Sequence, residues 1–322
     1  MSVSAPILAI KNLTVGFPRG DDSAYALAVN GLDLSLEAGH IMGIVGESGC
    51  GKSLTSLAIL GLIPPPGQRL SGSIQFEGQE LTTLDGESLR RIRGKRIALI
   101  PQDPLTALNP VYTVGNQLME VTQTHLGHSR DVARKHAIAL LDRVQIPDAK
   151  NRINQYPHEF SGGMRQRVMI AMALSCSPSL LIADEPTTAL DVTVQAQILG
   201  LIRELQRDMG MSILLITHDL GVVAELCDHV SVMYAGRIVE SAKCDTLFDA
   251  PSHPYTQGLF ASRPKPGQTV LTPIEGQPPA INDLPPGCSF APRCRKVVSD
   301  CHTSFPAAVA LGQDHWAHCI AL

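Results

Sequence analysis

The chain lacks the basic excess that is typical of proteins bound to nucleic acid. Its 26 Lys and Arg residues stand against 30 Asp and Glu residues, which gives a formal net charge of −4. Proteins that bind nucleic acid usually carry a basic surplus or a basic stripe, because contacts to phosphates supply much of their affinity. The composition therefore disfavours a nucleic-acid partner.

The sequence also lacks any apolar run of membrane-spanning length. A transmembrane helix needs about 20 consecutive apolar residues, and no stretch approaches that length. The opening segment MSVSAPILAIKNLTVGF has no charged region followed by a long apolar core, as a secretory signal would. We therefore expect a cytoplasmic chain. With 44% hydrophobic and 17% charged residues it is not disordered, and its length suggests about two domains.

Cysteine is sparse along most of the chain and crowded near its end. Four of the eight cysteines are scattered, and the other four lie within the last 35 residues. A disulfide framework is not expected in a cytosolic chain of this size. The scattered residues are Cys50, Cys176, Cys227 and Cys244, and the crowded ones are Cys288, Cys294, Cys301 and Cys319.

A phosphate-binding loop is the strongest pattern present. An apolar run at 41–45 predicts a strand, residues 46–53 fit G-x-x-x-x-G-K-[ST], and residues 53–61 predict a helix. In such a loop the backbone N–H groups point at the phosphates, Lys52 reaches the β and γ phosphates, and Ser53 supplies a hydroxyl to Mg²⁺. The Cys50 thiol, beside Lys52 and a helix N-terminus, is expected to have a lowered pKa. The nucleotide-binding candidates are Gly46, Glu47, Ser48, Gly49, Cys50, Gly51, Lys52 and Ser53.

Further short apolar runs predict a covered, mostly parallel sheet. They lie at 96–100, 179–184, 211–217 and 230–236, with helices between them, which indicates an α/β fold. Asp191 is the expected N-cap of one helix, and Gly210 is its expected C-terminal glycine. Residues 103–175 show two amphipathic helical segments and no clear strand, which predicts a mostly helical insert. A proline-rich stretch after residue 250 indicates an extended linker or irregular subdomain.

Two acidic residues end the predicted strand at 179–184. A carboxylate at the end of a strand beside a phosphate loop can hold Mg²⁺, which is the role expected for Asp184. Glu185 is then placed to polarise the attacking water. A strand-end acidic pair is not specific alone, and its meaning comes from the phosphate loop.

The segment Ser161-Gly162-Gly163-Met164 resembles the signature of ATP-binding cassette (ABC) ATPases. The family pattern is Leu-Ser-Gly-Gly-Gln, so Phe160 and Met164 depart from it while the central Ser-Gly-Gly is intact. The resemblance implies that this helix N-terminus meets the γ-phosphate held by a partner subunit.

The remaining landmarks of that family follow in order. Gln102 matches the Q-loop glutamine that contacts metal and water, Ala189-Leu190-Asp191 matches the D-loop, and His218 matches the histidine that contacts the γ-phosphate. The resemblance thus implies three catalytic residues, Glu185, His218 and Gln102, and three Mg²⁺ contacts, Ser53, Gln102 and Asp184. The aromatic residue that stacks on adenine is either Phe17 or Tyr25, of which Tyr25 is expected in an extra loop.

Two later segments are similar to dipeptide and oligopeptide import ATPases. They are HPYTQGLF at 253–260 and the cysteine-containing tail. This resemblance implies an ATPase that uses ATP and Mg²⁺ at the cytoplasmic face of the inner membrane. It implies two membrane-spanning permeases, a second and related ATPase, and an extracytoplasmic solute-binding protein as partners. A soluble ABC ATPase acting on nucleic acid and a non-catalytic regulatory module are the alternatives.

The spacing of the tail cysteines is C-x5-C-x6-C-x17-C. Structural zinc sites favour pairs separated by two to four residues, so zinc fits this spacing poorly. Four thiolates can instead hold a [4Fe–4S] cluster, and reduced thiols packed in a small subdomain are the third interpretation. We expect an ABC nucleotide-binding domain over residues 1–250, with an N-terminal antiparallel β region, and a C-terminal extension over 251–322.

Overall fold

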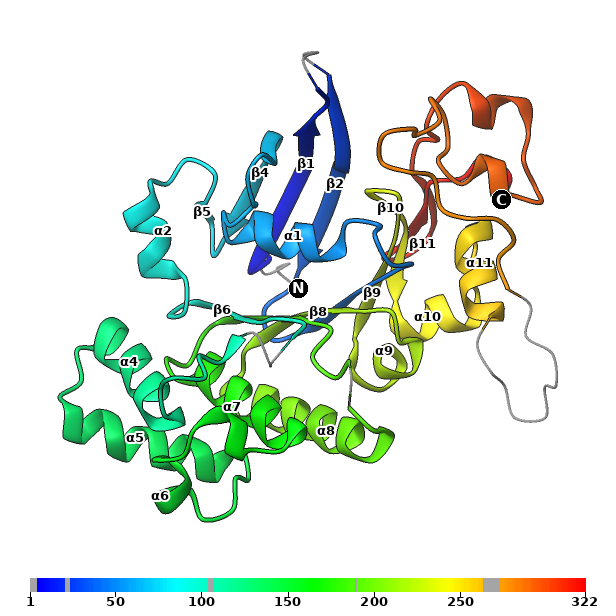
Figure 1. Ribbon diagram of the computed structural model, residues 1–322. Helices are drawn as coiled ribbons and strands as arrows, with labels where there is room; N and C mark the ends of the chain where they lie inside the picture. The colour runs from blue at the N-terminus through cyan, green and yellow to red at the C-terminus, as the bar shows by residue number, and fades with distance from the viewer. Residues whose placement is uncertain (1–4, 21–23, 104–106, 189, 263–272) are drawn as a thin grey trace. The chain divides into compact units, whose positions relative to one another are not determined.

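The computed structural model describes residues 5–20, 24–103, 107–188, 190–262 and 273–322 (Figure 1). The chain forms two compact units. The first unit joins Met1–Thr83 to Ile216–Leu322, and the second is Leu84–Leu215. The boundary between them falls inside strand β8 (Ser212–Thr217), whose residues are all buried.

An antiparallel sheet forms the N-terminal part of the first unit. It contains β1 (Leu8–Pro18), β2 (Tyr25–Leu36), β4 (Gln68–Phe76) and β5 (Gln79–Glu80), in the order β2-β1-β4-β5. Leu8, Ile10, Leu13 and Val15 of β1 are buried, although two exposed residues separate Ile10 from Leu13. A register shift in the pairing with β2 between Ile10 and Leu13 accounts for this break in the alternation of buried and exposed residues. The expected antiparallel region is confirmed. Tyr25 is the first residue of β2 and pairs with Pro18, so its expected position in an extra loop was wrong.

The other strands of the first unit lie in the order β11-β12-β10-β9-β3. The strand before the phosphate loop, β3 (Ile41–Val45), is buried along its whole length and runs parallel to β9 (His229–Tyr234). The antiparallel neighbours are β10 (Arg237–Lys243), β12 (His315–Ala317) and β11 (Val309–Gly312). Because β12 pairs with β10, the C-terminal extension is built onto the edge of this sheet.

The helices of the first unit are short. Among the described residues they are α1 (Lys52–Ile59), α9 (Leu220–Leu226), α10 (Cys244–Asp249) and α11 (Pro254–Ala261), with 3₁₀ turns at Ala291–Arg293 and Ser299–His302.

The second unit places two parallel strands beside a group of helices. The strands are β6 (Ile97–Ile100) and β7 (Leu180–Asp184). The helices described in this unit are α2 (Gly86–Ile92), α4 (Val114–Leu126), α5 (Arg130–Arg143), α6 (Ala149–Arg152), α7 (Gly162–Leu174) and α8 (Val192–Met209), with a 3₁₀ turn at Pro157–Glu159. Helices α4 to α7 follow β6 and precede β7 in the sequence and pack against one another (Figure 1), which confirms the expected helical insert.

Three of the longer helices begin directly after a residue whose side chain caps them. Asp191 accepts the N–H of Val194 at 2.9 Å and starts α8, which ends at Gly210 in a left-handed conformation. Thr113 and Ser129 cap α4 and α5 in the same way. No helix among the described ranges is both long enough and apolar enough to span a membrane.

Candidate ATP-binding and catalytic site

The phosphate loop connects the buried strand β3 to helix α1. Lys52 is the first residue of the helix and is buried, and its ammonium group donates to the carbonyl oxygens of Gly46 at 2.8 Å and Glu47 at 3.0 Å. Gly51 precedes the helix and provides no side-chain cap. A helix N-terminus and a lysine therefore meet in one loop, which is a donor set suited to an anionic phosphate.

Two glycines of the loop are required by close backbone contacts. A Cβ atom at Gly46 would lie 2.1 Å from the carbonyl oxygen of Met233. A Cβ atom at Gly51 would lie 2.4 Å from the carbonyl oxygen of Ala28, and Gly51 has a φ of +106°, which favours glycine. The pattern of the loop thus reflects its packing against β2 and β9.

The environment of the Cys50 thiol contradicts its expected lowered pKa. Cys50 is only 6% exposed, and its Sγ lies 3.7 Å from the Lys52 ammonium. Burial raises the pKa of the Cys50 thiol, although the Lys52 charge and its hydrogen bonds act in the opposite direction. The expected lowered pKa was wrong, because desolvation outweighs the nearby positive charge.

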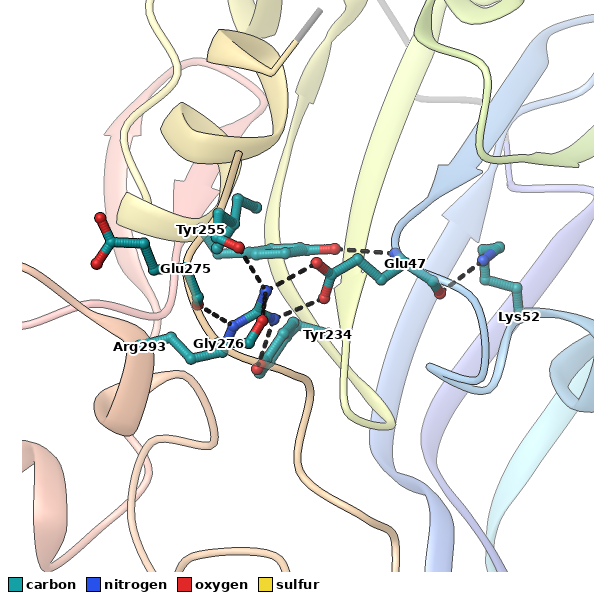
Figure 2. Close-up of polar contacts among 8 residues, drawn as sticks. Glu47, Lys52, Tyr234, Tyr255, Glu275, Gly276 and Arg293 are labelled. Carbon is teal, nitrogen blue, oxygen red and sulfur yellow. Dashed lines mark hydrogen bonds and ion pairs between the residues drawn. The ribbon is translucent and has the colours of Figure 1, made fainter. Parts of the chain in front are cut away.

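Glu47 of the loop is held by residues of the C-terminal extension (Figure 2). The Arg293 guanidinium donates to both carboxylate oxygens of Glu47, at 2.7 and 3.0 Å. The N–H of Glu47 donates to the Tyr255 hydroxyl at 2.9 Å. Sequence reasoning missed both partners: Tyr255 lies within the HPYTQGLF segment, and Arg293 precedes Cys294, but neither position carries a local signal for a contact more than 200 residues away.

The acidic pair lies at the end of β7 in the second unit. Asp184 is the last residue of the strand and is buried, and Glu185 follows it with a left-handed φ of 48°. The Gln102 amide donates to a Glu185 carboxylate oxygen at 3.0 Å, and the Thr188 hydroxyl donates to the same oxygen at 2.9 Å. The structure therefore brings two of the three expected catalytic residues into contact.

The Ser-Gly-Gly segment opens helix α7, also in the second unit. Ser161 is the N-cap, its hydroxyl accepts the N–H of Met164 at 3.3 Å, and both Ser161 and Gly162 are exposed. Asp191 is likewise exposed at the start of α8. Ala189 lies outside the described residues.

The remaining candidates belong to the first unit. His218 directly follows β8 and is exposed. Phe17 is half-buried on β1, and its ring packs so closely on Gly67 that a Cβ atom there would lie 2.6 Å away. Tyr25 is also half-buried, and its hydroxyl accepts the Gln68 amide at 2.5 Å. Both aromatic residues thus lie on the β1–β2 hairpin.

The four tail cysteines line one pocket with His253, Phe290 and His318. All eight cysteines of the chain are free thiols. Burial raises the pKa of Cys288, Cys294 and Cys319, and other thiols of the pocket add to this effect. Burial also lowers the pKa of His253 to about 3. Within the described part of the chain, however, no three His, Cys, Asp or Glu side chains are arranged to hold a metal ion.

Comparison with known sequences identifies the family. The family model "ABC transporter" matches residues 29–188, and "Oligopeptide/dipeptide transporter, C-terminal region" matches 239–301. The oligopeptide transport ATP-binding protein OppD of Haemophilus influenzae is 51% identical over 298 residues, which cover 92% of this chain and 91% of that protein. The chain belongs to the ATP-binding subunits of oligopeptide and dipeptide ABC transporters.

A second relative is similar over nearly its whole length, and two solved structures match part of this chain. The dipeptide transport ATP-binding protein DppD of Bacillus subtilis is 48% identical over 316 residues, covering 97% of this chain and 94% of that protein. A solved dimeric structure of a bacterial ABC transporter cassette matches with a TM-score of 0.65 and 27% identity, covering 74% of this chain and 98% of that one. A related dimeric structure, in a post-hydrolysis state bound to ADP and phosphate, matches with a TM-score of 0.64 and 26% identity, over 74% of this chain and 98% of that one. The predicted fold and the predicted ATPase family are thereby confirmed.

Proposed function

We propose that this ABC ATPase binds ATP with Mg²⁺ and hydrolyses it to power the import of dipeptides or oligopeptides. The observation that carries the proposal is the phosphate loop, where Lys52 and the uncapped N-terminus of α1 converge. The peptide substrate is inferred from the relatives, which are oligopeptide and dipeptide transport ATP-binding proteins. The two alternatives, a nucleic-acid ATPase and a non-catalytic module, find no support among these relatives.

Each candidate residue has a proposed role. The loop from Gly46 to Ser53 holds the phosphates, and Ser53, Gln102 and Asp184 provide oxygen ligands of the kind that Mg²⁺ prefers. Glu185 orients and deprotonates the attacking water, and the Gln102 amide at 3.0 Å fixes its carboxylate. His218 contacts the γ-phosphate, and Phe17 or Tyr25 stacks on adenine.

The signature helix acts across a pair of subunits. We assign Ser161, Gly162, Gly163 and Asp191 to contacts with the nucleotide of a second, related ATPase. The exposure of Ser161, Gly162 and Asp191 at the starts of α7 and α8 supports this role, because a helix N-terminus open to solvent can meet an anion from outside the chain. Two permeases and an extracytoplasmic solute-binding protein complete the proposed complex at the inner membrane.

The division of the chain into an ATP-binding domain over 1–250 and an extension over 251–322 is part of the proposal. The extension depends on the domain, because the carboxylate of Glu240 on β10 accepts the N–H groups of Ser252 and His253. The proposed function is tested with the purified transporter complex, in which peptide-stimulated release of phosphate from ATP is expected. Absence of ATP binding by the purified complex would overturn it.

The tail cysteines are proposed to hold a [4Fe–4S] cluster. Support comes from their convergence on one pocket as free thiols, in a subdomain with few large apolar residues. The arrangement described here is not that of a formed metal site, so loading requires the thiols to move and to lose their protons. The cluster supplies cross-links between Cys288, Cys294, Cys301 and Cys319.

Anaerobic purification tests the cluster. The protein should be brown and contain about four irons per chain. Cys294→Ser should lose the colour, whereas Cys176→Ser, which changes a cysteine outside the pocket, should keep it. Colourless protein with one zinc per chain would favour zinc, and colourless protein without metal would favour plain thiols.

A further inference from the structure

A partly buried ion pair joins the C-terminal extension to the phosphate loop (Figure 2). The Arg293 side chain is 5% exposed and that of Glu47 is 25% exposed. The guanidinium also donates to the Tyr234 hydroxyl at 3.2 Å and to the carbonyl oxygens of Glu275 at 2.9 Å and Gly276 at 3.2 Å. These contacts hold the plane of the Arg293 guanidinium in one orientation, in which two of its N–H groups point at the Glu47 carboxylate.

Glu47 is fixed through its backbone as well as its side chain. Its N–H donates to Tyr255, a fully buried residue whose ring packs on Tyr234 at a centroid distance of 4.5 Å and on Phe290 at 5.4 Å. Its carbonyl oxygen accepts the Lys52 ammonium at 3.0 Å. The residue that follows Gly46 is thus held by the extension on one side and by the phosphate-binding lysine on the other.

The charge of Glu47 conflicts with the proposed ligand unless it is neutralised. A carboxylate inside a phosphate loop repels an ATP triphosphate, because both are negative and the site is partly desolvated. A bidentate guanidinium removes most of that repulsion, and it also holds both carboxylate oxygens so that they do not bind other groups. The exposed pair between Arg295 and Glu275, at 73% and 79% exposure, belongs to the same extension, and in the described part of the chain neither side chain bonds to the loop.

We infer that Arg293 is a positioning residue for ATP binding: it neutralises Glu47 and holds the phosphate loop in the conformation that accepts the triphosphate. This inference rests on the proposed function. The extension then contributes to nucleotide binding although its residues belong to no nucleotide-binding motif. The extension and the ATP-binding domain cannot be treated as independent parts.

A charge-cancellation cycle in the full transporter complex tests the inference. The variants are Arg293→Met, Glu47→Gln and the double variant, with Arg295→Met as the matched control. We expect Arg293→Met to raise the Kd and KM for ATP about tenfold with a much smaller change in kcat. This is the effect of one uncompensated charge acting over several ångströms near a protein surface. Arg295→Met should match the wild type.

The double variant separates charge positioning from simple loss of packing. In Arg293→Met with Glu47→Gln the unpaired carboxylate is gone, so affinity for ATP should return to within about threefold of the wild type. Glu47→Gln alone removes the negative charge and keeps an oxygen for Arg293, so the uncompensated guanidinium should lower the Kd for ATP below the wild-type value. Arg293→Lys keeps the charge, tests the same idea if the methionine variant does not fold, and should lose less affinity than the methionine variant.

Two results would overturn the inference. One is Arg293→Met protein with unchanged affinity for ATP, and the other is a double variant that binds ATP no better than Arg293→Met. A wild-type complex that binds no ATP would instead overturn the proposed function, and this inference with it.

Discussion

Replacing Glu240 with glutamine should loosen the C-terminal extension from the sheet that carries it. Glu240 lies on β10 and is fully buried. Its two carboxylate oxygens accept the N–H of Ser252 at 2.8 Å and the N–H of His253 at 2.9 Å, and His315 Nε2 lies 2.9 Å from Oε1. One carboxylate therefore connects the start of α11 and strand β12 to the core.

The magnitude follows from those three contacts. A glutamine offers one oxygen, and its amide nitrogen then faces an N–H donor. One buried donor loses its partner, which costs about 1–3 kcal/mol, and the remaining bonds lose about 1 kcal/mol each with the carboxylate charge. The expected loss is about 3–5 kcal/mol of unfolding free energy, which corresponds to a fall of roughly 6–20 °C in the unfolding temperature of the unit, at about 2–4 °C per kcal/mol for its size.

Calorimetry of the purified chain measures this effect. Glu275→Gln is the matched control, because Glu275 is 79% exposed and pairs with an exposed Arg295. Such pairs contribute little, so the control should unfold within about 1 °C of the wild type. Glu240→Gln protein as stable as the control would refute the reasoning that this buried carboxylate joins the extension to the core.

Three further outcomes follow from individual sites. Cys50 should react with a maleimide at least tenfold more slowly in the folded protein than after denaturation, since it is buried with a raised pKa; rapid loss of ATPase activity that Cys50→Ser prevents would contradict this. Although burial acts against ionisation, hydrogen bonds from Ser73, Thr82 and backbone N–H groups lower the pKa of Glu80 to about 2 from 4.5. The contribution of the ionised Glu80 to the free energy of unfolding is therefore present above about pH 4.5 and is lost as the pH falls toward 2. Glu80→Gln should reduce the loss of stability at acid pH in a plot of stability against pH. Gly46→Ala should abolish ATP binding in an equilibrium binding assay, because its Cβ would lie 2.1 Å from a backbone oxygen; binding at wild-type affinity would contradict that steric argument.

The sequence predicts the elements of the fold because their signals are local. The apolar run before the phosphate loop, the Asp191 cap and Gly210 each report on their immediate neighbours, and the structure confirms them as β3 and the two ends of α8. The family resemblance, carried by ordered short motifs, is confirmed by relatives about 50% identical over most of the chain.

The remaining features depend on contacts that no local pattern encodes. The pairing of Glu47 with Arg293 spans 246 positions, and the burial of Cys50 depends on residues packed around it rather than on Lys52. Tyr25 was misplaced because β2 begins at this residue, which pairs with Pro18 at the end of β1. For Glu47 and Cys50, packing between residues far apart in the sequence decided the outcome.

The central claim is that this chain's hydrolysis of ATP drives peptide uptake, with Glu185 activating the water. The direct measurement is simultaneous ATP hydrolysis and peptide uptake by the transporter reconstituted in vesicles, comparing the wild type with Glu185→Gln. The glutamine variant should still bind ATP, while turnover falls by about 10²- to 10⁴-fold, or roughly 3–5 kcal/mol of barrier, and uptake falls with it. Normal turnover in Glu185→Gln, or uptake that persists without hydrolysis, would contradict the account.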